Sequence, residues 1–150
     1  MKTQIEAIER LAQFGVKPSL QRIAIMGYVM DNLVHPTADT VFSGLSASIP
    51  TLSKTTVYNT LKLLARQGAI LELSIDDKNV RYDANIFRHA HFRCKRCGGV
   101  HDVPVGDFEA LTLKYAGDLT ITESQLYYKG YCGKCRANAD AEADEEAPEP

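Results

Sequence analysis

The residues of this chain with the clearest chemistry are its four cysteines, which form two C-x-x-C pairs. Cys94 and Cys97 make the first pair, and Cys132 and Cys135 make the second. Each pair can present two thiolates to one ion, and two pairs complete the closed tetrahedron of a structural zinc site. Basic residues beside both pairs would offset the excess negative charge of four thiolates on one dication. We therefore expect these cysteines to hold one structural Zn(II) ion.

Other interpretations of the cysteines have different requirements. Two local disulfides would be unusual in the cytosol, where we expect this protein because residues 1–6 lack the apolar core of a signal peptide. A thioredoxin-like redox site needs one C-x-x-C pair in a βαβ context, which the sequence does not show. Rubredoxin-type iron uses a similar spacing and remains an alternative to zinc.

A second group of metal-ligand residue types surrounds the motif His89-Ala90-His91. On a strand, residues i and i+2 point to the same face, so both imidazoles can reach one ion. The alternative is a pair of exposed polar side chains. The neighbouring carboxylates Asp83 and Asp102 favour the metal interpretation. His35 lies at a break between helices, where a lone histidine is usually a surface or capping residue.

The elements that must position these residues begin with a helical N-terminal region. Apolar spacing and capping residues predict helices at about residues 3–14, 20–30, 38–45 and 54–67. Ser53 would cap the last of these helices, whose buried face would be Val57, Leu61 and Leu64. Two strand-like runs around a polar turn then predict a β-hairpin at residues 69–83. Helices followed by a hairpin are typical of a winged helix, a helix-turn-helix variant whose last helix enters the major groove.

The pattern changes after residue 84. Strand-like runs at 92–94, 100–103 and 126–128, with a helix at about 106–116, indicate a second, smaller α/β unit. Residues 137–150 are rich in acids and lack a basic residue, and their composition predicts disorder. The rest of the chain has a basic surplus, which permits nucleic-acid binding. No apolar run approaches the ~18 residues that a membrane span needs, so we expect no membrane partner.

Four short strings carry a resemblance to a known family. They are His35-Pro36-Thr37-Ala38, the run TTVYNTL from Thr55 to Leu61, Arg81-Tyr82-Asp83, and H-x-H-x-x-C-x-x-C-G from His89. In this order they resemble the ferric uptake regulator (Fur) family over about residues 3–136. The resemblance implies a homodimeric bacterial repressor that binds double-stranded DNA operators.

The resemblance also implies an α+β fold with two domains. An N-terminal winged helix-turn-helix at residues 1–83 would bind DNA. A small C-terminal α/β domain at residues 84–136 would contain the structural zinc and serve dimerisation and metal binding. The acidic tail would cover residues 137–150.

A regulatory metal site with ligands from both domains is a further implication of the resemblance. Its ligands here would be His35, Asp83, His89, His91 and Asp102. This mixed nitrogen and oxygen set suits Fe(II) or Mn(II). Aspartate at both carboxylate positions resembles the peroxide-sensing branch of the family (PerR), because iron-sensing members usually carry glutamate there. In that branch bound Fe(II) reacts with hydrogen peroxide and a ligand histidine is oxidised, which here would be His35 or His89.

A further metal site found in many iron-responsive members is not expected here. The aligned residues are Arg88, Ala90, Glu109 and Ser124, and three of these four residue types are not ordinary metal ligands. His101 has no counterpart in the family's sites, and we interpret it as incidental.

DNA contacts are expected from the outer face of the fourth helix and from its surroundings. Tyr58 and Asn59 would form the centre of the recognition face. The other contacts would come from Lys17, Arg22, Lys54, Thr55, Thr56, Lys62 and Lys78. The alternative is a solvated helix face that binds nothing.

Two other functions compete with a peroxide-sensing repressor. A Fur- or Zur-type sensor of iron or zinc sufficiency would share the fold and bind DNA without peroxide chemistry. A zinc hydrolase or deaminase would need an open zinc position, which four cysteine ligands do not leave. It would also need a general acid or base beside a ligand histidine, and Ala90 stands there instead. We therefore do not expect an enzyme.

Overall fold

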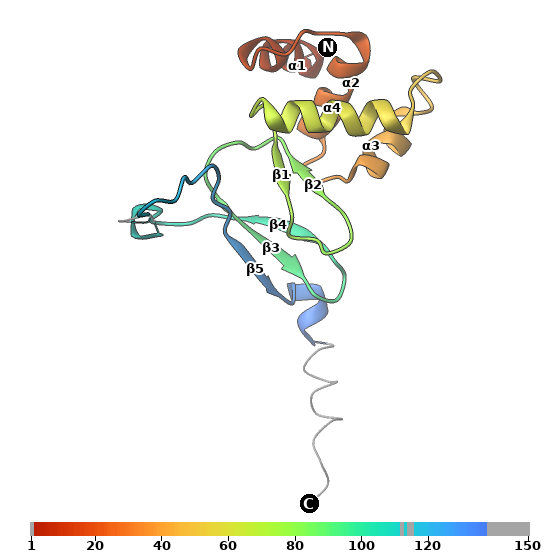
Figure 1. Ribbon diagram of the computed structural model, residues 1–150. Helices are drawn as coiled ribbons and strands as arrows, with labels where there is room; N and C mark the ends of the chain where they lie inside the picture. The colour runs from red at the N-terminus through yellow and green to blue at the C-terminus, as the bar shows by residue number, and fades with distance from the viewer. Residues whose placement is uncertain (1, 112, 114–115, 138–150) are drawn as a thin grey trace, which may run out of the picture. The chain divides into compact units, whose positions relative to one another are not determined.

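The computed structural model describes residues 2–111, 113 and 116–137 of the chain (Figure 1). It divides into two compact units, Met1–Phe87 and Arg88–Pro150. The sequence placed the boundary after Asp83, but Ala84 packs in the core of the first unit, and its carbonyl accepts a hydrogen bond from Arg10 at 3.1 Å. Residues 138–150, which form nearly all of the predicted disordered tail, lie outside the described residues.

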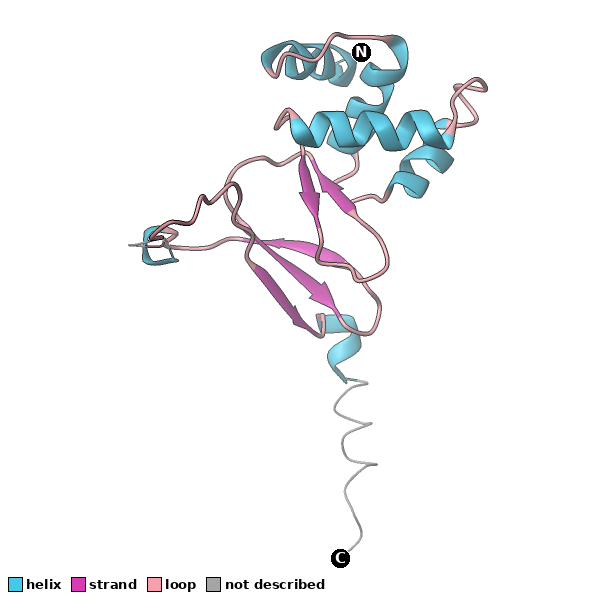
Figure 2. Ribbon diagram, viewed as in Figure 1, coloured by secondary structure: helices cyan, strands magenta, loops and turns pink. Residues whose placement is uncertain are grey.

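The first unit consists of helices followed by a β-hairpin (Figure 2). Its elements are α1 (Lys2–Gln13), α2 (Leu20–Asp31), α3 (Ala38–Leu45), α4 (Lys54–Arg66), β1 (Leu71–Leu73) and β2 (Arg81–Asp83). The two strands pair antiparallel, with Leu71 opposite Asp83. These elements lie where apolar spacing and turn residues predict them, so the helical part and the hairpin are confirmed.

Local signals determine where the helices of the first unit begin and end. The side chains of Ser19, Thr37 and Ser53 each accept a hydrogen bond from the backbone N–H three residues later, at the start of α2, α3 and α4. Such hydroxyl caps satisfy backbone donors that have no partner within the helix. After α4, Gly68 has a φ of 83°, in the left-handed region that glycine adopts most readily.

The core of the first unit determines which face of α4 remains at the surface. Val57, Leu61 and Leu64 of α4 are fully buried, as their spacing predicts. They belong to the same cluster as Ile25 and Val29 of α2. Burying an aliphatic side chain of this size contributes about 1.5–3 kcal/mol. The rotation of α4 is thereby fixed, and its polar face is left at the surface.

The second unit contains a three-stranded sheet. Its strands are β3 (Ala90–Cys94), β4 (Val100–Val103) and β5 (Tyr127–Gly130), in the order β4-β3-β5. β3 pairs antiparallel with β4 and parallel with β5, so residues from both sequence neighbours and a distant segment meet at β3. The α+β class is confirmed by these two sheets and the preceding helices. No helix in the described ranges is long and apolar enough to cross a membrane.

The helix expected at residues 106–116 is not present in the described part of that segment, and the prediction was wrong there. Only a 3-10 turn, Glu109–Leu111, forms, while residues 112, 114 and 115 lie outside the described residues. The Asp107 carboxylate accepts hydrogen bonds from the backbone N–H groups of Glu109 and Ala110. Leu111 and Leu113 are exposed, so no buried apolar face supports a longer helix. A short helical segment at residues 133–137 was not predicted.

A first prediction concerns Tyr82 of β2, whose side chain is fully buried and whose hydroxyl has no hydrogen-bond partner among the described residues. Burial raises the pKa of Tyr82 from 10.0 to about 12. This group's contribution to stability is therefore complete below pH 10 and lost as the pH rises toward 12. We expect Tyr82→Phe to change the free energy of unfolding at neutral pH by less than about 1.5 kcal/mol. In urea titrations at alkaline pH it should lose less stability than the wild type; an equal loss would contradict this account.

Candidate metal centres and nucleic-acid surface

The four cysteines converge in the second unit. Their sulfur atoms all lie within 4.8 Å of one another, and the Sγ atoms of Cys97 and Cys132 are 3.9 Å apart. Cys94 ends β3, and its carbonyl accepts a hydrogen bond from Gly98 at 3.0 Å, which closes the turn that carries Cys97. Cys132 follows β5, which lies beside β3, and Cys135 lies in the helical segment after it. Strand pairing thus brings the two sequence-distant pairs together.

Hydrogen bonds distinguish the cysteine thiols from one another. The backbone N–H of Cys132 donates to Sγ of Cys94 at 3.4 Å. This bond, together with one from the backbone of Cys97, lowers the pKa of Cys94 to about 6. The side chain of Cys132 raises the pKa of Cys135 to about 12. A divalent cation among the sulfurs would favour the thiolate at every position, because a coordinating thiol loses its proton.

The donor set of this cluster fits a structural zinc ion. Its four ligand atoms are all sulfur, and four sulfurs are the closed tetrahedral set that zinc adopts in structural sites. No fifth protein group is needed, and no coordination position remains for a substrate. The cluster would tie the C-terminal end of β5 to the C-terminal end of β3.

Two histidines and an aspartate converge elsewhere in the second unit. His91 of β3 lies opposite Asp102 of β4, and His89 precedes β3. The Nε2 atoms of His89 and His91 are 2.9 Å apart. Oδ1 of Asp102 lies 3.1 Å from the first of these nitrogens and 3.4 Å from the second. Two imidazole nitrogens and one carboxylate oxygen therefore face a common point, which is a partial ligand set for a divalent transition metal.

His35 and Asp83 are adjacent in the first unit. Nε2 of His35 lies 3.4 Å from Oδ2 of Asp83, and both side chains are almost completely buried. The other carboxylate oxygen accepts a hydrogen bond from the backbone N–H of Asn85 at 2.8 Å, which fixes its orientation. His35 has a φ of 55°, a left-handed conformation that is uncommon outside glycine and disfavoured before a proline. Such backbone strain is concentrated at functional sites.

Three successive residues of β2 hold the segment that carries His35. Nη1 of Arg81 donates to the carbonyl of His35 at 3.3 Å. The backbone N–H of Tyr82 donates to the carbonyl of Pro36 at 3.0 Å, and Asp83 contacts the imidazole. Because side chains alternate along a strand, Arg81 and Asp83 share one face while Tyr82 enters the core. The sequence string Arg81-Tyr82-Asp83 is therefore a clamp on the His35-Pro36 segment.

The predicted regulatory ligands thus occur as two sets, one in each unit, each with histidine and aspartate side chains within 3.4 Å. His101, interpreted as incidental, lies exposed on β4 with its ring centre 6.4 Å from that of Phe92. Arg88, one of the positions at which no further metal site was expected, has its guanidinium over the ring of Phe108, 4.9 Å from the ring centre.

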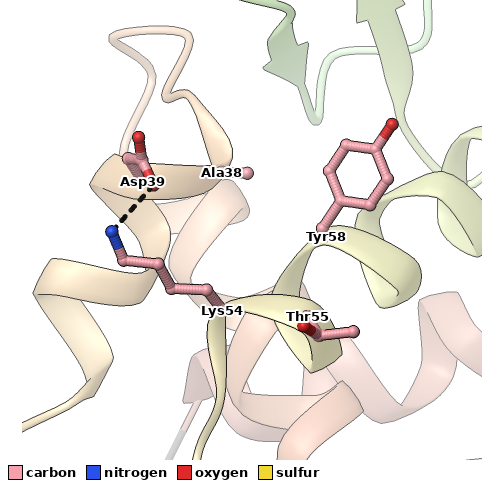
Figure 3. A pocket seen from close by; sticks show the side chains of 5 residues that line it. All are labelled: Ala38, Asp39, Lys54, Thr55 and Tyr58. Carbon is pink, nitrogen blue, oxygen red and sulfur yellow. Dashed lines mark ion pairs between the residues drawn. The ribbon is translucent and has the colours of Figure 1, made fainter.

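The outer face of α4 presents the residues predicted to contact DNA. Lys54, Thr55, Tyr58 and Asn59 are exposed, and Lys62 is half-buried. Three of them, Lys54, Thr55 and Tyr58, line a pocket of about 280 Å³ together with Ala38 and Asp39 of α3 (Figure 3). Thr56 differs from its neighbours, because its hydroxyl accepts a hydrogen bond from the capping residue Ser53 at 2.9 Å.

Two acidic partners of this face were not predicted from the sequence. Asp39 lies 3.5 Å from the ammonium group of Lys54, and Glu72 lies 3.5 Å from that of Lys62. Lys62 also lies over the ring of Tyr58, 5.6 Å from its centre. Each pair joins α4 to another element, so no spacing within one helix could have revealed it.

The remaining predicted DNA contacts lie on other elements of the first unit. Lys17 is exposed just before α2, and its carbonyl accepts a hydrogen bond from Nη1 of Arg22 at 2.8 Å. Lys78 is exposed in the turn between β1 and β2. Its backbone N–H donates to Oδ1 of Asp76 at 3.0 Å, so the turn has a defined conformation.

Comparison with known proteins places the chain in a family. Residues 13–129 match the model of the ferric uptake regulator family. The chain belongs to the ferric uptake regulator family. It is accordingly a metal-responsive transcriptional regulator of a family whose members bind DNA as dimers.

This Fur-family chain is similar to proteins that are named as peroxide-responsive repressors and to others that are named as ferric uptake regulators. It is 33% identical to the peroxide-responsive repressor PerR of Staphylococcus aureus (strain NCTC 8325 / PS 47), over 87% of this chain and 90% of that protein. It is 28% identical to the ferric uptake regulator of Francisella tularensis, solved with iron, with a TM-score of 0.67 over 82% of this chain and 96% of that one. The Helicobacter pylori ferric uptake regulator, at 20% identity and a TM-score of 0.66 over 90% and 93% of the two chains, shares the fold.

Substitution of one cysteine should disrupt the cysteine cluster and leave the first unit of this Fur-family chain folded. We expect Cys135→Ser to reduce the zinc content of the purified chain well below one ion per chain and to lower the melting temperature of the second unit. The reason is that a serine hydroxyl is a poor replacement for a thiolate ligand, and zinc binding is coupled to folding in small units. Elemental analysis and differential scanning calorimetry measure these effects.

The matched control for this substitution is Asp118→Asn, at an exposed position of the second unit. It should keep the wild-type zinc content and melting temperature. Full zinc retention and unchanged melting in Cys135→Ser would contradict the assignment.

Proposed function

We propose that this protein is a homodimeric DNA-binding repressor that senses peroxide through an iron-loaded regulatory site. The first unit would bind the operator and the second would dimerise, with Zn(II) in the cysteine cluster. The observation that carries the proposal is the pairing of histidine with aspartate, and not glutamate, in both ligand sets. His35 contacts Asp83, and His89 and His91 contact Asp102. The similarity to the Staphylococcus aureus PerR supports the same branch.

The regulatory site would use both ligand sets for one ion. Three imidazole nitrogens and two carboxylate oxygens form a set that accepts Fe(II) or Mn(II). Each set already holds its side chains in contact: Asp83 is fixed by Asn85, and Asp102 faces both of its histidines. Little side-chain entropy remains to be lost when an ion binds, which favours binding at these residues.

Ligands from both units would make metal binding a conformational signal. An ion held by all five residues restricts the arrangement of the two units, because each ligand set is fixed to its own unit. Metal then shifts the population toward whichever arrangement completes the site. The shift can be no larger than the difference in metal affinity between the two arrangements. We propose that the completed arrangement is the one that binds the operator.

Peroxide would end repression by altering a ligand. An Fe(II) ion held by these residues would catalyse the transfer of one oxygen atom from hydrogen peroxide to an adjacent imidazole. The imidazole would lose two electrons, peroxide would gain them, and water would be the other product. His35 and His89 are the proposed sites of oxidation. The oxidised ring would no longer match the position that its aspartate partner holds, and the ion would lose a ligand.

The DNA interface would be centred on the exposed face of α4. Tyr58 and Asn59 would contact base edges. The residues nearer the phosphates would be Lys54, Thr55, Thr56 and Lys62. Lys17 and Arg22 before and within α2 would add phosphate contacts. Lys78, exposed in the hairpin turn, would lie on the wing of a winged helix and would reach the minor groove.

Metal dependence of DNA binding is the first test of this function. Selection from random-sequence duplexes should enrich one palindromic site when Mn(II) is present and none when a chelator removes it. Binding should weaken with salt, because phosphate contacts release counterions. Asn59→Ala should lower the affinity for that site by about 1–3 kcal/mol, measured by fluorescence anisotropy.

The control for the DNA experiment is Gln4→Ala, at an exposed position of α1 and outside the proposed contacts. It should bind like the wild type. Equal enrichment with and without metal would sink the proposed metal dependence, whatever the affinity.

Peroxide chemistry is tested by mass mapping of the histidines. We expect hydrogen peroxide to add one oxygen atom to peptides containing His35 or His89 in the iron-loaded protein and to leave the manganese-loaded protein unchanged. The doubly substituted Asp83→Glu, Asp102→Glu protein should be oxidised more slowly, because a longer side chain displaces the carboxylate from its histidine.

A metal-sufficiency regulator without peroxide chemistry is the second candidate. The similarity in fold and sequence to the Francisella tularensis ferric uptake regulator, solved with iron, favours it. Metal-dependent DNA binding without histidine oxidation would select this candidate over the first.

A further inference from the structure

The hairpin turn and the His35 segment are joined by an uninterrupted set of hydrogen bonds. Nε and Nη2 of Arg81 donate to Oδ2 of Asp76 at 3.1 and 3.0 Å, while Nη1 donates to the carbonyl of His35 at 3.3 Å. The second carboxylate oxygen, Oδ1 of Asp76, accepts the backbone N–H of Lys78 at 3.0 Å. One guanidinium thus connects the backbone of a proposed metal ligand to the turn that carries a proposed DNA contact.

The burial of this pair distinguishes it from ordinary surface ion pairs. The side chain of Asp76 is 5% exposed and that of Arg81 is 22% exposed. An exposed pair contributes little, because water and side-chain entropy offset its attraction. Removal of one partner from a buried pair is more damaging, because it leaves a buried charge without compensation. The planar guanidinium also holds two acceptors at fixed directions, which a lysine ammonium does not.

The strained backbone of His35 gives a structural reason for the Arg81–Asp76 pair. The φ of 55° places its carbonyl and imidazole in directions that an unsupported residue before proline rarely adopts. The carbonyl is held by Arg81, and the imidazole contacts Asp83, on the same face of β2. The imidazole, the carbonyl of His35, Arg81 and Asp76 therefore belong to one connected set of contacts, through which a change at His35 can reach the turn.

We propose that Arg81 is a positioning residue that couples the metal ligand His35 to the wing turn at residues 76–80. Metal binding would fix the His35 segment, and Arg81 with Asp76 would transmit that order to the turn around Lys78. The wing would then be more ordered when the regulatory site is filled than when it is empty. This inference rests on the proposed function, since it takes His35 as a metal ligand.

Hydrogen exchange at the wing provides a readout that is independent of DNA binding. We expect Mn(II) to slow amide exchange in the peptide covering residues 76–80 of the wild type, because the Lys78 N–H donates to Asp76. In Arg81→Gln this slowing should be absent, and Mn(II) affinity should fall about tenfold, as is typical when a residue that orients a ligand is lost. Arg81→Lys should recover part of the affinity but not the full slowing of exchange.

The matched control is Glu72→Gln in β1 of the same hairpin. It removes the 3.5 Å ion pair between Glu72 and Lys62 of α4. It should retain both the wild-type Mn(II) affinity and the exchange response at residues 76–80. Zinc content shows whether the second unit of each variant is folded, and thermal melting shows whether the first unit is folded.

The outcomes separate this inference from the proposed function. If the wild type binds no Mn(II) or shows no metal-dependent DNA binding, the proposed function fails. If the wild type responds but Arg81→Gln keeps its Mn(II) affinity and its exchange response, the coupling role of Arg81 is wrong. Equal losses in Arg81→Gln and Glu72→Gln would show only general destabilisation of the hairpin and would also overturn the inference.

Discussion

Repulsion among four thiolates is the constraint on which the second unit depends. Four sulfur atoms that lie within 4.8 Å of one another cannot all carry charge unless a cation lies among them. Hydrogen bonds divide the thiols: backbone N–H groups of Cys132 and Cys97 lower the pKa of Cys94, while the side chain of Cys132 raises the pKa of Cys135. A zinc ion would remove this repulsion and would tie β5, which is far away in the sequence, to the end of β3. The same β3 carries His91, and its antiparallel partner β4 carries Asp102, so one strand pair connects the cysteine cluster to these two proposed sensing residues.

In the first unit, contacts of β2 hold the proposed ligands His35 and Asp83 in place. There the His35-Pro36 segment is clamped by β2, through a side chain, a backbone N–H and a second side chain. The clamp keeps His35 in a strained backbone conformation and holds Asp83 beside it. Each unit therefore presents a short set of proposed ligands with one member on a strand, Asp83 on β2 and His91 on β3. An ion that used both sets would act on the arrangement of the units, because each set is held by contacts within its own unit.

Features encoded locally could be predicted from the sequence, and features that depend on distant contacts could not. The buried spacing of Val57, Leu61 and Leu64 and the cap at Ser53 belong to one helix, and both were predicted correctly. The helix expected at residues 106–116 failed because Asp107 satisfies the local backbone and no packed face supports Leu111 and Leu113. Spacing alone suggested helix there, but an isolated segment of that length gains its stability from packing.

The candidate site shows the same division. The cysteine pairs and the His89-Ala90-His91 motif were visible because ligand spacing is local. Assigning His35, Asp83 and Asp102 to one regulatory site required the family resemblance, because they lie on different elements. The proposed role of Arg81 could not be predicted from the sequence. It depends on strand alternation and burial, which place the guanidinium between Asp76 and the carbonyl of His35.

The most direct test of the central claim is a manganese titration of the chain before and after zinc removal. The claim is that the zinc cluster is the scaffold that holds the sensing residues of the second unit in place. Zinc would be released with a reversible thiol reagent and restored under reducing conditions, and Mn(II) binding would be followed by calorimetry. The account predicts that Mn(II) binding is lost with zinc and returns with it. Unchanged Mn(II) affinity in the zinc-free chain would contradict the claim.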